Sequence, residues 1–223
     1  MTTPDAVRRR LRRMTELGRL LPLGGPADGA WLAESAAAAV LRGAAASVPG
    51  AALDEVRLAL ADPAAAEDPT TPVPPTALPP GPLRVEADVA VWDLDEPLPV
   101  LTAALRTVLF DAAVEKLGLR VAVVDLRVAR LLDAVPPEHS APEPPAAESP
   151  SDQAGTAAAS TPGVAHLTAA LGTAVHWAPD HVRVELATAA GHRAPDVARA
   201  VRAAVGSALH DERAVTVVIT ATH

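Results

Sequence analysis

Two histidines on either side of a short turn come nearest to a metal-binding pair in this chain. His176 and His181 flank a turn that contains Ala-Pro-Asp at 178–180. Strand alternation predicts that both imidazoles lie on one face of a hairpin, opposite its apolar side chains. Two imidazoles can hold a metal ion when a third ligand joins them, and the sequence places no evident third ligand beside them. We therefore favour exposed polar residues of a hairpin and keep a metal site at His176 and His181 as the weaker hypothesis.

The other polar clusters do not point to catalysis. The chain has no cysteine, which excludes thiolate nucleophiles, thiolate zinc sites and disulfides. It contains no GxSxG, HExxH, GxGxxG or phosphate-binding-loop motif. Asp93, Asp95 and Glu96 precede a predicted helix at Pro99, where acidic side chains favour the positive end of the helix dipole; a magnesium or partner site is the alternative. We expect neither enzymatic activity nor a bound cofactor.

A cluster of arginines near the N-terminus is the main candidate for a binding site. Residues 3–17 are predicted to form an amphipathic helix whose polar face is crowded with basic side chains. One interpretation is a helix that lies on an anionic membrane surface, where each basic residue contributes about 1 kcal/mol. A second is docking on an acidic partner, including the acidic linker of this chain, and a third is an ordinary solvated helix, which is usual for charge runs. The basic side chains are those of Arg8, Arg9, Arg10, Arg12 and Arg13.

The composition limits the classes of protein to which the chain can belong. Its 223 residues carry a formal net charge of −8 at pH 7, which argues against a protein that binds nucleic acid over its whole surface. Hydrophobic residues make up 49% of the chain, which is enough for a core built mainly from alanine, valine and leucine. No run of about 20 apolar residues is present to cross a bilayer, and the segment after the first arginines is too short and polar for a signal peptide. We expect a cytoplasmic protein.

The C-terminal part of the chain has the clearest periodicity. Residues 181–223 are predicted to run strand, helix, strand, because apolar residues alternate in both outer segments and Pro195 suits the first turn of a helix. The same order occurs at 83–128, where Pro99 opens a helix with the same apolar spacing. The correspondence indicates an internal duplication.

Two proline-rich stretches divide this pattern. Residues 62–82 read as an insertion at a hairpin tip, because a sheet interior does not accept prolines that lack the N–H donor. Residues 133–159 are acidic, contain no lysine or arginine and are predicted to be a disordered linker. The predicted fold is α+β, with two αββαβ units in tandem. The predicted divisions are a basic amphipathic helix at 1–19, the first unit at 29–132, the linker at 133–159 and the second unit at 160–223.

Each predicted unit begins with a helix or its remnant. Trp31 to Ser47 is predicted to be an alanine-rich helix that follows a connection at 20–29 and ends at Pro49-Gly50. In the second unit the leading helix is either short, within 152–160, or absent.

These motifs together resemble a known family. A Pro-Gly turn, a hairpin, the helix PDVARAVRAAV at 195–205 and the strand VTVVI at 215–219 resemble the alkaline shock protein family of bacterial envelope stress response proteins. The insertion at 62–82 and the reduced leading helix of the second unit depart from the family pattern. The resemblance implies a protein that is not an enzyme and is held at the cytoplasmic face of the membrane by a partner protein.

The functional hypothesis follows from this resemblance and from the arginines. We expect a non-catalytic scaffold or adaptor of the envelope stress response type, peripheral at the inner membrane. Its expected partners are a membrane-anchor protein or a homologous stress protein, and an anionic membrane surface; a homo-oligomer is compatible with this hypothesis. The alternative is a nucleic-acid-binding module that uses the basic N-terminal helix, which is weakened by the scarcity of aromatic stacking residues.

Overall fold

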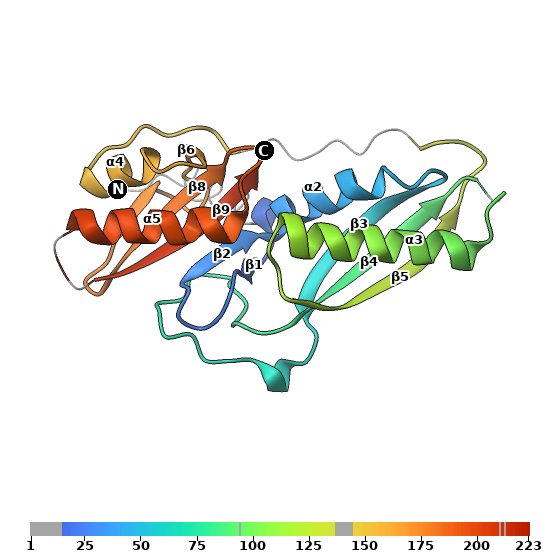
Figure 1. Ribbon diagram of the computed structural model, residues 1–223, viewed down its shortest axis with the longest axis horizontal. Coiled ribbons are helices and arrows are strands. Elements are labelled where there is room, and N and C mark those ends of the chain that lie inside the picture. The colour runs from blue at the N-terminus through green and yellow to red at the C-terminus, as the bar shows by residue number, and fades with distance from the viewer. Residues whose placement is uncertain (1–14, 94, 137–144, 210, 212) are drawn as a thin grey trace. The chain divides into compact units, whose positions relative to one another are not determined.

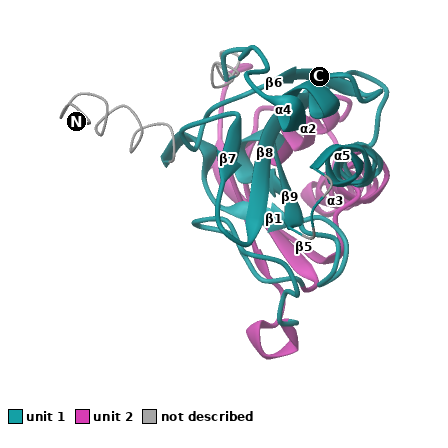
Figure 2. Ribbon diagram, turned by 90° about the vertical axis from the view of Figure 1, so that its left-hand side faces the viewer, with its two compact units in different colours: residues 1–36, 67–80, 142–223 teal, residues 37–66, 81–141 magenta. Residues whose placement is uncertain are grey.

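The computed structural model describes residues 15–93, 95–136, 145–209, 211 and 213–223, and its architecture is α+β (Figure 1). The chain divides into two compact units, coloured separately in Figure 2. Unit 1 comprises residues 1–36, 67–80 and 142–223, and unit 2 comprises residues 37–66 and 81–141. The predicted arginine cluster at residues 8–13 lies outside the described residues.

Unit 2 is a three-stranded sheet with a helix along one face. Its strands lie in the order β3-β4-β5, with β3 (Ala51–Leu60) antiparallel and β5 (Val121–Leu131) parallel to the central β4 (Leu83–Val91). The parallel connection from β4 to β5 runs through α3 (Leu98–Asp111) and the π-helical turn Ala112–Lys116. Helix α2 (Glu34–Ala45) leads into β3.

Helix α3 forms where its sequence predicts it. Pro99 lies in its first turn, where the missing N–H costs no helical hydrogen bond. The buried residues Leu101, Leu105 and Leu109 recur every four positions and therefore share one helical face. They pack toward the sheet, whose Val85 and Val89 are also buried.

Unit 1 is built on a six-stranded sheet. The strand order is β1-β2-β9-β8-β6, and β7 also pairs with β8. The elements are β1 (Leu20–Pro22), β2 (Ala30–Ala33), α4 (Gln153–Ala159), β6 (Val164–Leu167), β7 (Val175–Trp177), β8 (His181–Thr188), α5 (Ala194–Leu209) and β9 (Ala214–Thr222). Strands β8 and β9 are parallel and are connected by α5, which buries Val197, Val201 and Val205.

The predicted insertion at a hairpin tip agrees with the structure, and part of it has its own contacts. Leu60 pairs with Leu83 at the ends of β3 and β4, so the residues between them form the connection. Residues 67–80 of that connection belong to unit 1. There they lie along β1, because Leu20 donates to the carbonyl of Thr76 at 3.2 Å and Leu78 donates to the carbonyl of Leu20 at 2.8 Å.

The predicted helix from Trp31 to Ser47 begins too early. Ala30–Ala33 is strand β2, and α2 starts at Glu34. Trp31 lies beside Val218 in the parallel ladder to β9, is 2% exposed and donates its indole N–H to the carbonyl of Leu78 at 3.4 Å. The preceding segment at 20–29, predicted to be a connection, likewise contains β1.

The predicted linker at 133–159 is helical at its C-terminal end. Residues Gln153–Ala159 form α4 instead of the expected disorder, and Ala154 and Ala158 are buried. The side chain of Asp152 caps the helix by accepting a hydrogen bond from the backbone N–H of Gly155 at 2.7 Å, which satisfies a donor that the helix cannot use. The short-helix alternative within 152–160 therefore describes this element. In the described part of the chain, no helix is long and apolar enough to cross a membrane.

Candidate functional site: the charged face of the β3-β4-β5 sheet

One face of the β3-β4-β5 sheet carries ionised side chains. Successive side chains of a strand leave opposite faces, so Val85, Ala87 and Val89 point toward α3 while their neighbours point away. The register places Glu86 beside Asp125 on β5 and beside Arg57 on β3. The charged residues of this face, here called the charged face, are Glu55, Arg57, Arg84, Glu86, Asp88, Asp125 and Arg127.

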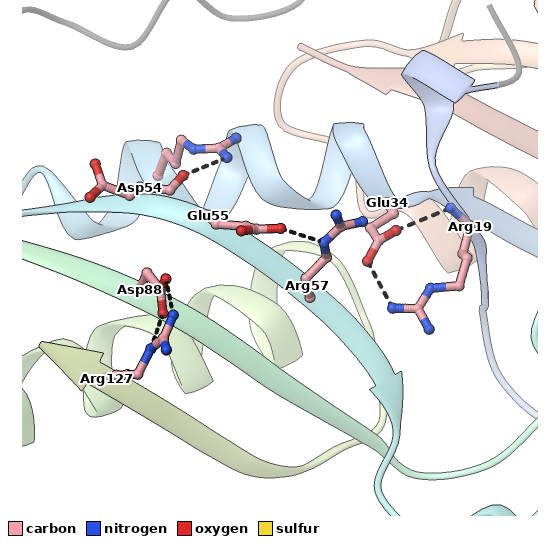
Figure 3. A network of polar contacts seen from close by, with 8 residues as sticks. Arg19, Glu34, Asp54, Glu55, Arg57, Asp88 and Arg127 are labelled. Atoms are coloured by element: carbon pink, nitrogen blue, oxygen red, sulfur yellow. Dashed lines mark hydrogen bonds and ion pairs between the residues drawn. The ribbon is translucent and has the colours of Figure 1, made fainter. Parts of the chain in front are cut away.

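The strongest contact on the charged face joins β4 to β5. Arg127 donates two hydrogen bonds to the carboxylate of Asp88, from Nε to Oδ1 at 2.8 Å and from Nη2 to Oδ2 at 2.6 Å (Figure 3). Two parallel bonds between a guanidinium and a carboxylate fix both groups in one geometry. The hydrogen bond from Arg127 holds the pKa of the Asp88 carboxyl below its ordinary value. Asp88 is therefore an ionised acceptor and not a proton donor at neutral pH.

The remaining charges form looser pairs. The Nε atom of Arg57 lies 2.8 Å from Oε1 of Glu55 (Figure 3). Arg84 lies between two carboxylates, 3.5 Å from Asp125 and 3.9 Å from Glu86. Exposed pairs of this kind contribute about 0–1 kcal/mol each to stability, so the stability of unit 2 does not explain why so many of them gather on one face.

A shallow depression of about 400 Å³ lies on the charged face. Its lining contains four carboxylates and two guanidinium groups, which leaves an excess of two negative charges. Such a surface attracts basic side chains, because opposite charges lower the energy of approach. The lining residues are Glu55, Arg57, Glu86, Ala87, Asp88, Asp125, Leu126 and Arg127.

Strand β8 of unit 1 carries the same three residues as β4 in a buried setting. Arg-Val-Glu occurs at 84–86 in β4 and again at 183–185 in β8, and each strand lies centrally between an antiparallel and a parallel neighbour. The Nη2 atom of Arg183 lies 3.1 Å from Oε1 of Glu185. The side chains of this pair are 8% and 0% exposed, whereas those of Arg84 and Glu86 are 40% and 53% exposed.

A loop between β6 and β7 is held by Glu185. Oε2 of Glu185 accepts a hydrogen bond from the backbone N–H of Leu171 at 2.8 Å. The backbone of Glu185 holds both ends of the loop, because it donates to the carbonyl of Ala174 at 2.8 Å and accepts from the N–H of Thr168 at 3.0 Å. Burial raises the pKa of Glu185 to about 7, against the opposing effects of Leu171 and Arg183.

The two histidines proposed as a weak metal site lie near each other. The ring centroids of His176 and His181 are 6.4 Å apart, and Nδ1 of His181 lies 2.9 Å from a carboxylate oxygen of Asp180. In the described part of the chain, no group of three or more histidine and acidic side chains is placed to hold a metal ion. The carboxylate of Asp93 accepts a hydrogen bond from the backbone N–H of Asp95 at 3.0 Å, which is a turn contact ahead of α3.

The sequence contains a signal for the charged face that lies outside any catalytic motif. The two Arg-Val-Glu tripeptides occupy equivalent strands, and their shared sequence is visible without a structure. Their different burial is not visible in the sequence, because it depends on contacts outside the strand, such as the hydrogen bond between Leu171 and Glu185. A comparison of the chain with protein-family models, curated proteins and solved structures finds no match in any of the three.

Proposed function

We propose that this chain is a non-catalytic scaffold or adaptor that binds protein partners through the charged face of the β3-β4-β5 sheet. The observation that carries the proposal is the difference in burial between two equivalent Arg-Glu pairs. Arg183 and Glu185 are buried in their own unit, where the Glu185 carboxylate contacts a loop, while Arg84 and Glu86 are partly exposed. An exposed sheet face with the same charged pair is suited to a protein partner that buries this pair on binding.

The chemistry of the charged face indicates the kind of partner. The excess of carboxylates in the depression favours a protein segment with lysine or arginine side chains. It disfavours the phosphate backbone of a nucleic acid, which needs cationic groups for affinity. The guanidinium groups of Arg57 and Arg127 already bind carboxylates of this face at 2.6–2.8 Å. A basic partner therefore replaces existing ion pairs with new ones, which contributes more to specificity than to affinity.

We also propose that the two units arose by internal duplication and are joined by the acidic stretch after β5. The order of elements supports this, since helix, antiparallel strand, central strand, helix and parallel strand occur in α2-β3-β4-α3-β5 and again in α4-β6-β8-α5-β9. A duplicated protein presents two related surfaces in one chain. Only one of the two related faces is then open to partners.

The resemblance to the alkaline shock protein family supplies the setting of the proposal. In this setting the chain acts in a bacterial envelope stress response at the cytoplasmic face of the inner membrane. A membrane-anchor protein or a homologous stress protein is the partner on the charged face, and the basic side chains of Arg8 to Arg13 meet an anionic lipid surface. The alternative remains a nucleic-acid-binding module that uses the same arginines.

The test is an affinity purification with two matched charge reversals. Glu55→Lys changes the charged face, while Asp196→Lys changes an equally exposed ion-paired carboxylate on α5. Quantitative mass spectrometry of the bound proteins is expected to find partners that are retained by the wild type and by Asp196→Lys but are lost from Glu55→Lys. Identical bound proteins for all three chains would contradict the proposal. RNA as the main retained component, released by salt, would favour the alternative.

A further inference from the structure

In the part of the chain that the structure describes, the outer edge of β5 is unpaired in unit 2, whereas the corresponding edge of β9 is paired in unit 1. Among the described residues, β5 pairs only with β4, whereas β9 lies between β8 and β2. Strands β5 and β9 have the same position in their units. Each follows the crossover helix and pairs in parallel with the strand that precedes that helix. An unpaired edge exposes a row of backbone N–H and C=O groups that accepts another strand.

The register defines what a strand beside β5 must offer. Val124, Asp125 and Leu126 occupy the places of Val217, Val218 and Ile219, because each triplet pairs with the same positions of its central strand. Strand β2 sets Trp31 beside Val218 in unit 1. On a strand beside β5, the residue next to Asp125 must be basic to pair with its carboxylate. The residues on either side of it must be apolar, because Val124 and Leu126 point to the other face and are half-buried.

We propose that the occupant of this edge is β5 of a second copy of this chain, paired antiparallel about a two-fold axis at Leu126. This register places Asp125 opposite Arg127 of the second copy, and Val124 opposite Val128 of the second copy. Both charged pairs lie on the charged face, and both apolar pairs lie on the face toward α3. Opposite charges in cross-strand pairs are stabilising, and a two-fold interface uses the same patch on both copies.

Other antiparallel registers are disfavoured by charge or by face. A two-fold axis at Asp125 sets two aspartates opposite each other, and an axis at Arg127 does the same with two arginines. A shift of the pairing by one residue brings the apolar side chains opposite the charged ones. Only the register centred on Leu126 sets opposite charges beside each other and apolar side chains beside each other over residues 123–128. This segment pairs regularly with β4, and the pairing is irregular at both of its ends.

Arg127 is able to make both contacts. Its guanidinium already donates from Nε and Nη2 to Asp88, and a guanidinium has five N–H donors. The Arg127 side chain is 77% exposed, so the remaining donors are accessible to a carboxylate that approaches along the edge. Asp125, which lies 3.5 Å from Arg84, would then join a charge network that runs across both copies.

The absence of native cysteine allows a register-specific cross-linking test. A cysteine at Leu126→Cys lies opposite itself in the second copy, with Cα atoms about 4.5–5.5 Å apart, and is expected to give a disulfide-linked dimer under mild oxidation. Val124→Cys and Val128→Cys are the matched controls. In the proposed register each lies about 13 Å along the strand from its own copy, beyond the roughly 7 Å that a disulfide bridges. Neither is expected to cross-link alone, whereas a mixture of the two is expected to give the mixed dimer.

A second measurement does not depend on cysteine variants. Asp125→Arg sets arginine opposite Arg127 of the second copy and is expected to abolish the concentration-dependent dimer seen by sedimentation velocity. Asp111→Arg makes the same charge change on α3 and is expected to leave the dimer intact. The proposal is overturned if the wild type stays monomeric, if Asp125→Arg dimerises as the wild type does, or if Val124→Cys alone cross-links as well as Leu126→Cys.

Discussion

Glu185 accepts a hydrogen bond from the backbone N–H of Leu171 at 2.8 Å, and its side chain is fully buried. The same residue binds Thr168 and Ala174 through its backbone, so one position fixes both ends and the middle of the 168–174 loop. The carboxylate of Glu185 also pairs with Arg183, so a substitution of Glu185 changes a buried ion pair and the loop contacts at once.

The raised pKa of Glu185 predicts a stability that depends on pH. Its pKa is about 7 in the folded protein, against an ordinary value of 4.5, so the folded state binds this proton more tightly than the unfolded chain. The contribution to the free energy of unfolding is fully present below about pH 4.5 and is lost as the pH rises through about 7. Its size is on the order of 3 kcal/mol.

Urea unfolding at several pH values between about 5 and about 8 measures this effect. The wild type is expected to lose stability toward the higher pH, and Glu185→Gln, which cannot titrate, is expected to show a smaller loss. Equal pH dependence in the two proteins would mean that another group is responsible.

Two equivalent arginines are predicted to differ in their contribution to stability. Arg183→Met leaves the carboxylate of Glu185 buried and unpaired, which costs about 3–5 kcal/mol above pH 7. Arg84→Met removes the corresponding exposed arginine and is expected to change the free energy of unfolding by no more than about 1 kcal/mol. Chemical denaturation of the two variants in the same buffer gives the comparison. Similar losses of stability would show that burial does not increase the contribution of the Arg183–Glu185 pair to stability.

The turn at Pro162-Gly163 is predicted to require glycine. Gly163 has a φ of +89°, and a Cβ atom there would lie 2.7 Å from Cγ2 of Val197 and 2.9 Å from Nδ1 of His192. Gly163→Ala is therefore expected to destabilise the protein by about 1–3 kcal/mol.

The matched control for this turn is Gly206→Ala within α5. Apart from the adjoining residues and the backbone of the same helix, no atom lies within 4 Å of the added Cβ, and alanine favours a helix over glycine by about 1 kcal/mol. This variant is expected to raise the melting temperature, while Gly163→Ala lowers it. Thermal unfolding followed by circular dichroism distinguishes the two signs, and a stabilised Gly163→Ala would contradict the strain argument.

The N-terminal arginines are predicted to contact anionic lipid. Co-sedimentation with anionic vesicles at low salt is expected to pellet the wild type, and physiological salt is expected to release part of it, because the attraction is electrostatic. Neutral vesicles and a variant with glutamine at all five arginine positions are the controls. If the variant pellets as the wild type does, the arginines are not the lipid contact. If neither protein pellets, membrane placement requires a partner protein.

The elements predicted correctly are those defined by local sequence. The helices at Pro99 and Pro195 and the strands 83–91 and 181–188 follow from proline position and from alternation within a few residues. The pairing of Leu60 with Leu83 follows because the proline-rich segment between them cannot continue either strand.

The elements predicted incorrectly depend on distant partners. The alanine-rich sequence after Trp31 predicts a helix that includes this residue, but Trp31 lies beside Val218 in the parallel ladder. Glu185 belongs to the polar side of an alternating strand, yet it is buried, and its carboxylate accepts a hydrogen bond from the backbone of Leu171 in the 168–174 loop. Neither contact leaves a periodic signal in the sequence. The open charged face differs from its buried counterpart for the same reason.

The parallel pairing of β2 with β9 has a consequence for the order of folding. Ala30–Ala33 leaves the ribosome early, but its partner Ala214–Thr222 is synthesised only after the rest of unit 2 and the acidic stretch that follows it. The described helices and strands of unit 2 end at Leu131, so this unit is able to fold first. The edge of β2 that pairs with β9 stays unpaired until β9 has been synthesised. Closure of so long a loop is slow, which makes the docking of β9 the expected late step in the maturation of the protein.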